Sequence, residues 1–274
     1  MLRRSLAAKG RTVFCRRQRI PVALALIVVQ NPDMGSRHMR GASAIIAVLI
    51  GATCAFAPRG HGAELQQIGR DDLCVTNGAV SALPGGQLAI DTPSSRAVLN
   101  ASREVTTDQV AEIRFRYLGP SATSKPLASG ELRRQIGLKL RAEDTCNLIY
   151  ATWHIEPDAV VAVSIKRNAG KHTHEQCHAG GYINLKRQKA STLAPIKAGE
   201  THTLRAELRG NDLKVIADGN VAWQGALGDA ASSVAGPPGF RTDNARFEFG
   251  FYADAPARAG AGVPLGACVK SEGD

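Results

Sequence analysis

Between Arg134 and Arg187 the chain alternates apolar and polar residues in short runs, and Gly, Pro, Asn or Asp separates one run from the next. A period of two is typical of strands with one buried face and one solvated face. Further runs of this kind lie within 111–117, 204–224 and 247–251. Strands that each carry one apolar face must stack as two sheets or close into a barrel. The chain is therefore predicted to be an antiparallel all-β protein.

The formal net charge of +10 is concentrated in the first 63 residues. That segment contains ten Lys and Arg but one acid, Asp33, whereas residues 64–274 contain 24 Lys and Arg and 23 Asp and Glu. A nucleic-acid-binding domain carries its basic residues on the folded part of the chain. The charge distribution therefore argues against nucleic acid as a partner.

Residues 1–63 have the pattern of an export signal. A basic segment that begins at Met39 precedes the apolar run 42–56, and this run is shorter than the ~20 residues that a helix needs to span a bilayer. Small residues follow the run, which predicts cleavage between Pro58 and Glu64.

We therefore expect residues 64–274 to form a single mature β-sandwich domain, periplasmic or secreted, with no stable membrane anchor. A membrane anchor retained at 42–56 is the alternative. A second apolar run upstream of the first indicates that the natural start is Met34 or Met39 and that the preceding residues are an extension.

Two of the six cysteines lie in the leader, and the other four are Cys74, Cys146, Cys177 and Cys268. An even number of cysteines in an exported chain predicts two disulfides, for which three pairings exist. We favour Cys146–Cys177, which joins nearby strands, and Cys74–Cys268, which ties the two ends of the domain together. Free buried thiols are the alternative.

Several segments resemble those of a known superfamily, the concanavalin A-like lectin/glucanase jelly rolls. Gly137–Asp144, followed by Asn147 and Tyr150, is similar to a strand–turn–strand of these proteins. Residues 204–220 are similar to their next hairpin, and 239–251 to their late strand. The resemblance implies an antiparallel two-sheet jelly-roll sandwich whose concave sheet is the glycan groove.

The polar residues of the central strands share one face if the apolar residues Ile136, Ile149, Trp153, Val163 and Ile183 point to the core. Amides, cations and phenols on one surface suit the hydroxyl and carboxylate groups of sugars. The ligand-binding candidates are Gln135, Lys139, Arg141, Tyr150, His154, Lys166, Asn184 and Lys186, with Thr152 and Tyr182 on the same face. An ordinary solvated sheet face is the alternative.

Three of the seven histidines, His172, His174 and His178, lie within Lys171–His178. The spacing His-x-His places the first two on one face of a strand, as in metal sites, but His178 joins them only if the chain curls. They are weak metal candidates, and no cofactor is predicted. The other interpretations are contact with a sugar, catalysis, or a solvated loop held by a disulfide.

The paired-carboxylate motif of the superfamily's glucan hydrolases is missing from the sequence, which argues against a glycosidase. The alginate lyases of this fold resemble the chain in part: Glu131-Leu132-Arg133 and Gln135-Ile136 match, but Gly137 stands where those lyases have a His. A lyase would use His172, His174 and Tyr182 as its catalytic residues. The sequence favours an exported polysaccharide-binding protein. The alternatives are a lyase acting on a uronic-acid polymer and a structural envelope or host-interaction protein without catalysis.

Overall fold

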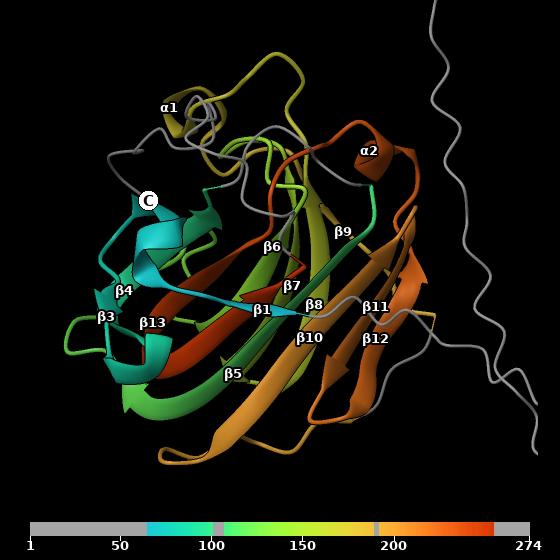
Figure 1. Cartoon of the computed structure of the whole chain (residues 1–274). Coiled ribbons are helices and arrows are strands. Elements are labelled where there is room, and N and C mark those ends of the chain that lie inside the picture. Colours follow the sequence, from blue (N-terminus) through green and yellow to red (C-terminus); the bar gives the residue numbers. More distant parts are fainter. Residues whose placement is uncertain (1–64, 101–106, 189–191, 255–274) are drawn as a thin grey trace, which may run out of the picture. The chain divides into compact units, whose positions relative to one another are not determined.

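Antiparallel strands account for most of the described residues, which are 65–100, 107–188 and 192–254 of the computed structural model (Figure 1). The strands are β1 Gln66–Ile68, β2 Leu73–Asn77, β3 Ser81–Ala82, β4 Leu88–Leu99, β5 Gln109–Pro120, β6 Arg134–Leu140, β7 Leu148–Glu156, β8 Val160–Lys166, β9 Tyr182–Asn184, β10 Thr201–Arg209, β11 Asp212–Ala217, β12 Asn220–Ala226 and β13 Gly239–Ala253. Two short helices, α1 His174–Cys177 and α2 Asp229–Ser232, lie between strands, as do the 3-10 turns Arg70–Asp72 and Pro84–Gly86. No helix in the described ranges is long and apolar enough to cross a bilayer.

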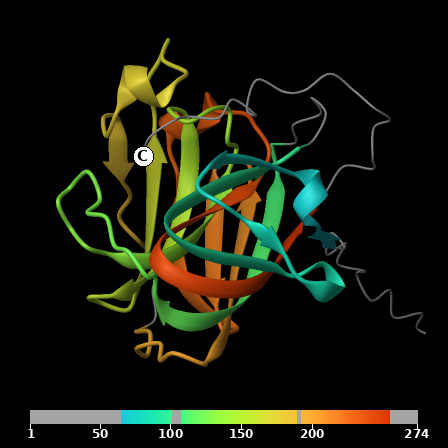
Figure 2. The same cartoon turned by 90° about the vertical axis from the view of Figure 1, so that its left-hand side faces the viewer.

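The longest strand, β13, divides the sheet into two layers. One of its edges pairs with β4 and then β1, and β4 and β13 run side by side in Figures 1 and 2. The other edge pairs with β6 along 239–243 and with β5 along 245–253. From β5 the sheet continues through β10, β11 and β12, which we call the first layer. From β6 it continues through β7, β8 and β9, which we call the second layer.

Asn244 lies where β13 changes its partner from β6 to β5. Its φ of 55° is in the left-handed region, which Asn tolerates better than most residues. Its Oδ1 accepts from the Lys125 amide at 2.7 Å, and its Nδ2 donates to the carbonyl oxygens of Lys125 and Arg133 at 2.9 and 3.1 Å. These bonds hold the segment between β5 and β6 at the point of division.

The core lies between the two layers and is built from the apolar face of each strand. Phe115 of β5 and Trp153 of β7 meet edge to face across it, with ring centroids 5.8 Å apart. Burial of such a side chain contributes about 1.5–3 kcal/mol. Four of the five predicted core residues of the second layer are buried. The exception, Ile183, is 45% exposed because its strand β9 is short and lies at the sheet edge.

The predicted fold class, an antiparallel all-β sandwich, is confirmed, although the two layers are parts of one hydrogen-bonded sheet. β11 and β12 form a hairpin whose two turn residues, Asp218 and Gly219, both have positive φ, as a two-residue turn of this kind requires. The sequence pattern missed β4, because Pro93-Ser94-Ser95 interrupts its alternation. The predicted leader, start residue and cleavage position lie outside the described residues.

The predicted Cys146–Cys177 disulfide is present, with a Cα–Cα distance of 5.9 Å. It joins the turn before β7 to the end of α1. Cys74 is disulfide-bonded as well. Because Cys268 lies outside the described residues, the Cys74–Cys268 pairing stays a prediction.

Candidate functional site

The outer face of the second layer gathers most of the polar residues that the alternation predicted. Side chains paired in register lie on the same side of a sheet. The pairs in register are Gln135 with His154, Lys139 with Tyr150, Lys166 with Tyr182, Asn184 with Ser164, Arg241 with Gly137, Asp243 with Gln135 and Arg96 with Arg241. We call this surface the polar face, and its members are Arg96, Gln135, Lys139, Tyr150, Thr152, His154, Lys166, Tyr182, Asn184, Arg241 and Asp243.

Asp243 organises the buried end of the polar face. Its Oδ1 accepts from Arg96 Nη2 at 2.7 Å. Its Oδ2 accepts from Gln135 Nε2 at 2.6 Å and from Arg241 Nε and Nη2 at 3.1 and 2.9 Å. Burial alone would raise the pKa of Asp243, but Arg241 and Arg96 outweigh burial and the pKa is lowered. The carboxylate is therefore charged at neutral pH and fixes three side chains.

Two tyrosines and two cations form a continuous row across the polar face. The Arg241 guanidinium carbon lies 4.7 Å from the centroid of the Tyr150 ring. The Tyr150 and Tyr182 rings stack with their centroids 6.1 Å apart. Lys166 Nζ then lies 5.4 Å from the centroid of the Tyr182 ring. Each cation is attracted to the electron-rich face of a ring, and Tyr182 is the exposed member of the row, at 43%.

Gln135 offers an acceptor that the described residues do not use. Its Nε2 is bonded to Asp243, but its Oε1 is buried and has no hydrogen-bond partner among the described residues. A buried oxygen without a donor costs about 1–3 kcal/mol. Its neighbour Gly137 has no room for a side chain, because a Cβ there would lie 2.8 Å from the Thr152 Cα. Close approach of β7 therefore accounts for the Gly where the resembling lyases have a His.

His154 stands opposite Gln135 and is neutral at pH 7. Burial, Arg133 and Arg241 together lower the pKa of His154 to about 4. Arg133 Nη1 lies 3.3 Å from His154 Nε2, and since a guanidinium only donates, Nε2 accepts and the ring proton is on Nδ1. Arg133 also pairs with Glu131, so the two ends of the partial Glu-Leu-Arg motif bind each other.

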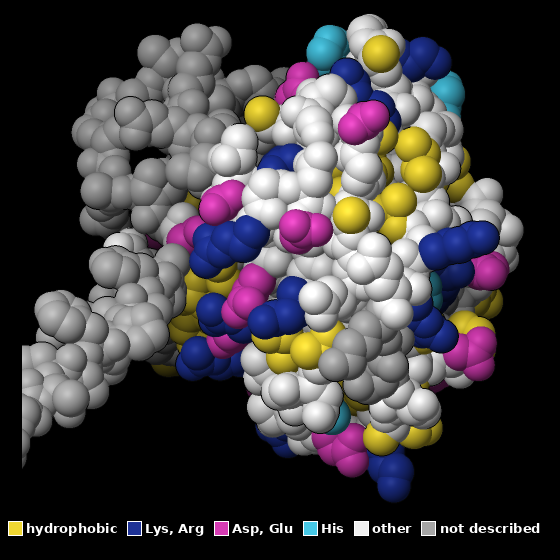
Figure 3. All heavy atoms as spheres, turned by 90° about the vertical axis from the view of Figure 1, so that its right-hand side faces the viewer, with side chains coloured by type: hydrophobic (Ala, Val, Ile, Leu, Met, Phe, Trp, Pro, Cys, Tyr) yellow, Lys and Arg dark blue, Asp and Glu magenta, His cyan; other side chains and the backbone are white. Residues whose placement is uncertain are grey.

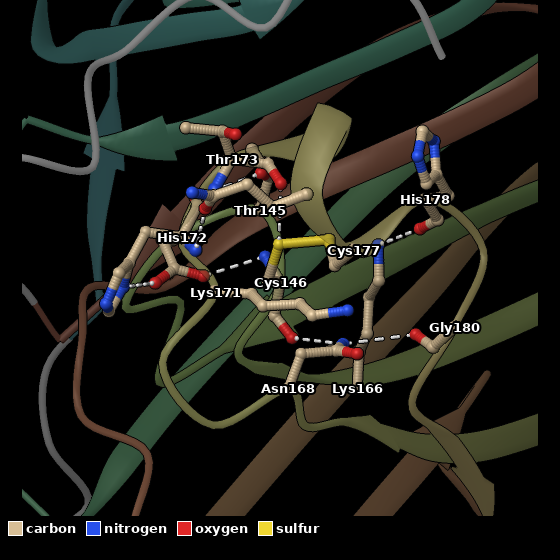
Figure 4. The surroundings of a disulfide bond; sticks show 12 residues. Thr145, Cys146, Lys166, Asn168, Lys171, His172, Thr173, Cys177, His178 and Gly180 are labelled. Atoms are coloured by element: carbon tan, nitrogen blue, oxygen red, sulfur yellow. Dashed lines mark hydrogen bonds and ion pairs between the residues drawn. A yellow bond between two sulfur atoms is a disulfide. The ribbon is translucent and has the colours of Figure 1, made fainter.

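The histidine segment does not form the predicted strand (Figure 4). Thr173 caps the short helix α1, and Gln176 completes a capping box, so His172 and His174 do not share a strand face. His172 Nδ1 lies 2.7 Å from Asp144 Oδ2. His174 and His178 instead contact each other, with ring centroids 6.1 Å apart. The His-x-His spacing argument assumed a strand and therefore does not apply here, while the weak metal assignment to these histidines stays a hypothesis.

Among the described residues, one group of possible metal ligands has its atoms within 4.8 Å of one another, and it consists of Glu143, Asp144 and His172. Asp144 is already occupied, because its Oδ1 accepts from the amide of Cys146 at 2.7 Å and both its oxygens accept from Asn147 Nδ2 at 3.0 Å. These bonds explain the position of the carboxylate, because they stabilise the turn before β7.

The disulfide-bonded loop between Lys166 and Tyr182 lies along the edge of the polar face. Lys166 Nζ donates to the carbonyl oxygen of His178 at 2.8 Å (Figure 4). Asn168 Nδ2 donates to the carbonyl oxygens of Cys146 and Gly180, both at 3.1 Å. The loop is thus attached to the last residue of β8 and to the turn before β7.

Arg141 is not part of the polar face, which corrects the prediction from alternation. It follows β6 with a φ of 47°, so its side chain leaves the strand pattern. Its Nη1 donates to the carbonyl of Ala231, and its Nη2 to those of Thr107 and Gly210. Burial lowers the pKa of Arg141, and Asp108 partly offsets this effect. Arg141 holds loops together, while the remaining candidate, Lys186, is exposed beyond the end of β9.

Sequence reasoning missed Arg96, Arg241 and Asp243 as members of the site. Arg241 and Asp243 alternate with the buried residues Phe240 and Thr242 in β13, so a period-two signal was available. Arg96 carried no such signal, because its strand β4 was not predicted. Only the pairing of β13 with both β4 and β6 brings the three residues to Gln135.

The outer face of the first layer provides a contrast. There two acids each bridge two cations: Glu112 binds Arg114 and Arg205, and Glu207 binds Arg205 and Lys214. Lys and Arg side chains lie beside Asp and Glu over this side of the molecule (Figure 3). On the polar face four cations, Arg96, Lys139, Lys166 and Arg241, and the carboxylate of Asp243 are all buried. The first layer thus has a solvated face of ion pairs, whereas the charged groups of the polar face are shielded from solvent.

No protein-family model matches the chain, and no curated protein sequence matches it. Among solved structures, it is similar to carbohydrate-binding module CBM66 from Bacillus subtilis (TM-score 0.45, 17% identity, 65% of this chain and 91% of that one). It is also similar to the metal-free Emp46p carbohydrate recognition domain (TM-score 0.45, 14% identity, 68% and 90%) and to the Caenorhabditis elegans galectin LEC-6 (TM-score 0.35, 7% identity, 68% and 98%). At these identities and TM-scores the similarity concerns only the arrangement of the strands.

Proposed function

We propose that the chain is an exported carbohydrate-binding protein that holds a polysaccharide on its polar face. The observation that carries the proposal is the buried Gln135 Oε1, which has no donor among the described residues. It sits beside guanidinium groups that Asp243 holds in place. A fixed acceptor next to fixed donors suits a ligand that presents many hydroxyl groups, each able both to donate and to accept.

The exposed part of the polar face is accessible to a ligand. Tyr182 and Asn184 of β9 are exposed, and His154 of β7 is partly exposed. A polymer can therefore contact the β9 side of the polar face first. Such a surface is also compatible with the length of a polysaccharide, which extends beyond any single contact.

Replacing Tyr182 or Asn184 by Ala is expected to weaken polysaccharide binding about tenfold each, equivalent to ~1.4 kcal/mol. The reason is the loss of a phenol or amide contact at the entrance, on side chains whose exposure spares the core. Affinity electrophoresis against a panel of neutral and acidic polysaccharides, followed by calorimetry, measures the effect.

The matched control is Tyr252→Ala, since Tyr252 also carries an arginine over its ring, Arg114 at 4.4 Å, but lies on the first layer. This variant should bind like the parent. If Tyr182→Ala and Asn184→Ala both bind every polysaccharide as the parent does, the polar face is not the binding site.

A lyase acting on a uronic-acid polymer is the second candidate, because the exposed Tyr182 lies beside the Lys166 cation. Such a reaction needs a base near a cation that pairs with the uronate carboxylate. His154 is poorly suited, since its pKa of about 4 makes it a weak base. Tyr182 remains the proposed base, with His172 and His174 on the adjoining loop. Tyr182→Phe should then abolish the rise in ultraviolet absorbance of the unsaturated product, and a parent protein without any such rise excludes the lyase.

A further inference from the structure

The short strand β9, Tyr182–Asn184, leaves one edge of the sheet open. It is the last strand of the second layer, and among the described residues β8 is the one strand that pairs with it. All three of its residues are exposed, and Tyr182 and Ile183 are two of the three large hydrophobic side chains that are exposed in the described ranges. Such an edge presents backbone N–H and C=O groups to which another strand can bond.

The hydrogen bonds on either side of β9 show which of its backbone groups point outward. The Gly181 carbonyl accepts from the residue that follows β8 at 2.9 Å, and the Leu185 amide donates to a carbonyl of β8 at 3.0 Å. Because the backbone groups of an antiparallel strand alternate between its two edges, Ile183 also bonds toward β8. Tyr182 and Asn184 therefore direct their N–H and C=O groups away from the sheet.

The features that commonly protect an edge strand do not occur in β9. They are charged residues, Pro and bulges, whereas Tyr182-Ile183-Asn184 is uncharged and pairs with β8 without a register shift. The other end of the sheet is different. There β12 has a register shift against β11, and its Gln224 carbonyl accepts from the Gln188 amide at 2.9 Å. β9 is thus the open end of the sheet.

The sequence of β9 is complementary to itself in an antiparallel arrangement. When two copies meet about a two-fold axis at Ile183, Tyr182 of each copy faces Asn184 of the other, and these pairs exchange their outward hydrogen bonds. The two Ile183 side chains then face each other with their Cβ atoms about 4.5–5.5 Å apart, so both lose exposed apolar surface. In this register Lys186 faces Gly180 of the second copy and does not oppose another cation.

The accessible part of the polar face becomes larger in this arrangement. Most members of the polar face are buried, and Tyr182 and Asn184 are its exposed members. A single copy therefore offers a polymer only a short strip along β9. In a continuous sheet the two-fold axis is perpendicular to the sheet, so the exposed residues of both copies lie side by side on the same face.

We propose that β9 pairs with β9 of a second copy and that the two polar faces then bind one polysaccharide together. The ligand in this inference rests on the proposed function, whereas the strand pairing is tested without a ligand. A three-residue strand buries little area, and interfaces at the small end of the range are weak. A polymer that contacts both copies should strengthen the dimer, because its second contact is intramolecular.

Sedimentation velocity of the full chain measures the pairing at concentrations from micromolar to roughly millimolar. The dimer fraction should rise with concentration, and added polysaccharide should raise it further. Ile183→Lys should abolish both increases, because two cations then face each other across the axis. Leu132→Lys, at an exposed apolar residue outside β9, is the matched control and should dimerise like the parent.

Charge reversal at Ile183 identifies the contact. Ile183→Glu should be monomeric by itself, whereas an equimolar mixture of Ile183→Lys and Ile183→Glu should form the dimer again. Each variant alone should bind a long polysaccharide about tenfold more weakly than the parent does. Both should bind a short oligosaccharide as the parent does, because an oligosaccharide does not reach the second copy.

A parent that stays monomeric at every concentration, with and without polysaccharide, would overturn the inference. Polysaccharide binding that Tyr182→Ala weakens would still leave the proposed function intact. A dimer that persists in Ile183→Lys would also overturn the inference, because the copies then meet elsewhere. A dimer that is lost in Ile183→Lys but binds no polysaccharide as the parent would overturn the proposed function and the shared ligand, and leave the strand pairing in place.

Discussion

Replacing Asp243 by Ala is expected to lower the free energy of unfolding by about 3–5 kcal/mol, the cost of removing one partner from a buried ion pair. Asp243 is 1% exposed and accepts from Arg96, Gln135 and Arg241. Without the carboxylate, two buried guanidinium groups repel each other and keep no oppositely charged partner within the described ranges. Chemical denaturation of the parent and the variant measures the difference.

The matched control is Glu207→Ala in the first layer. Glu207 also bridges two cations, Arg205 and Lys214, but its side chain is partly exposed. Ion pairs of this kind contribute about 0–1 kcal/mol. A loss in Asp243→Ala no larger than that in Glu207→Ala would show that the network around Asp243 does not stabilise the fold.

The same network predicts how stability depends on pH. The pKa of Asp243 is lower in the folded chain than its unfolded value of about 3.9, so its contribution is complete above that value and is lost as pH falls through the folded pKa. The folded pKa of His154, about 4, is also lowered, so stability declines as pH falls from roughly 6.5 to about 4. Asp243→Asn should remove the loss of stability that occurs as pH falls below about 3.9. His154→Gln should remove the loss that occurs between roughly pH 6.5 and about 4. Denaturation profiles that coincide with the parent's in both variants would contradict this assignment.

Alternation predicted the fold and the polar face because one physical fact determines both. In the second layer, residues such as Ile136 and Trp153 point inward, so Gln135 and His154 must point outward on neighbouring strands. This rule needs no knowledge of which strands pair. It therefore identified Gln135, Lys139, Tyr150 and their neighbours from the sequence alone.

Features that depend on distant pairing or on an unusual backbone angle were not predictable in this way. Arg141 continues the alternation of β6 in the sequence, but its positive φ turns it toward Ala231 and Gly210. Arg96 and Asp243 meet only because β13 lies between β4 and β6. The helix α1, in contrast, was predictable from the sequence. Thr173 and Gln176 form the Thr-x-x-Gln pattern of a capping box, which indicates a helix start where a strand was predicted.

Replacing both Cys146 and Cys177 by Ser is expected to lower the free energy of unfolding by about 3–4 kcal/mol, the chain-entropy value for a loop of this length. The two cysteines are 31 residues apart. Without the bond, the unfolded chain gains the conformations that the closed loop excludes. Peptide mapping of the non-reduced parent checks the pairing, and denaturation of parent and double variant measures the loss.

The position of this disulfide ties its effect to the polar face. It anchors the segment between β8 and β9, which carries the His178 carbonyl that accepts from Lys166 Nζ and ends where Tyr182 begins β9. A loosened loop lets Lys166 and Tyr182 adopt several orientations, so the double variant should also bind polysaccharide more weakly when fully folded. A reductant should lower the stability and binding of the parent by more than those of the double variant, in which the disulfide of Cys74 is the one left to break. An unfolding free energy within about 1 kcal/mol of the parent's would show that the hydrogen bonds of Asn168 and Thr173 hold the loop without the disulfide.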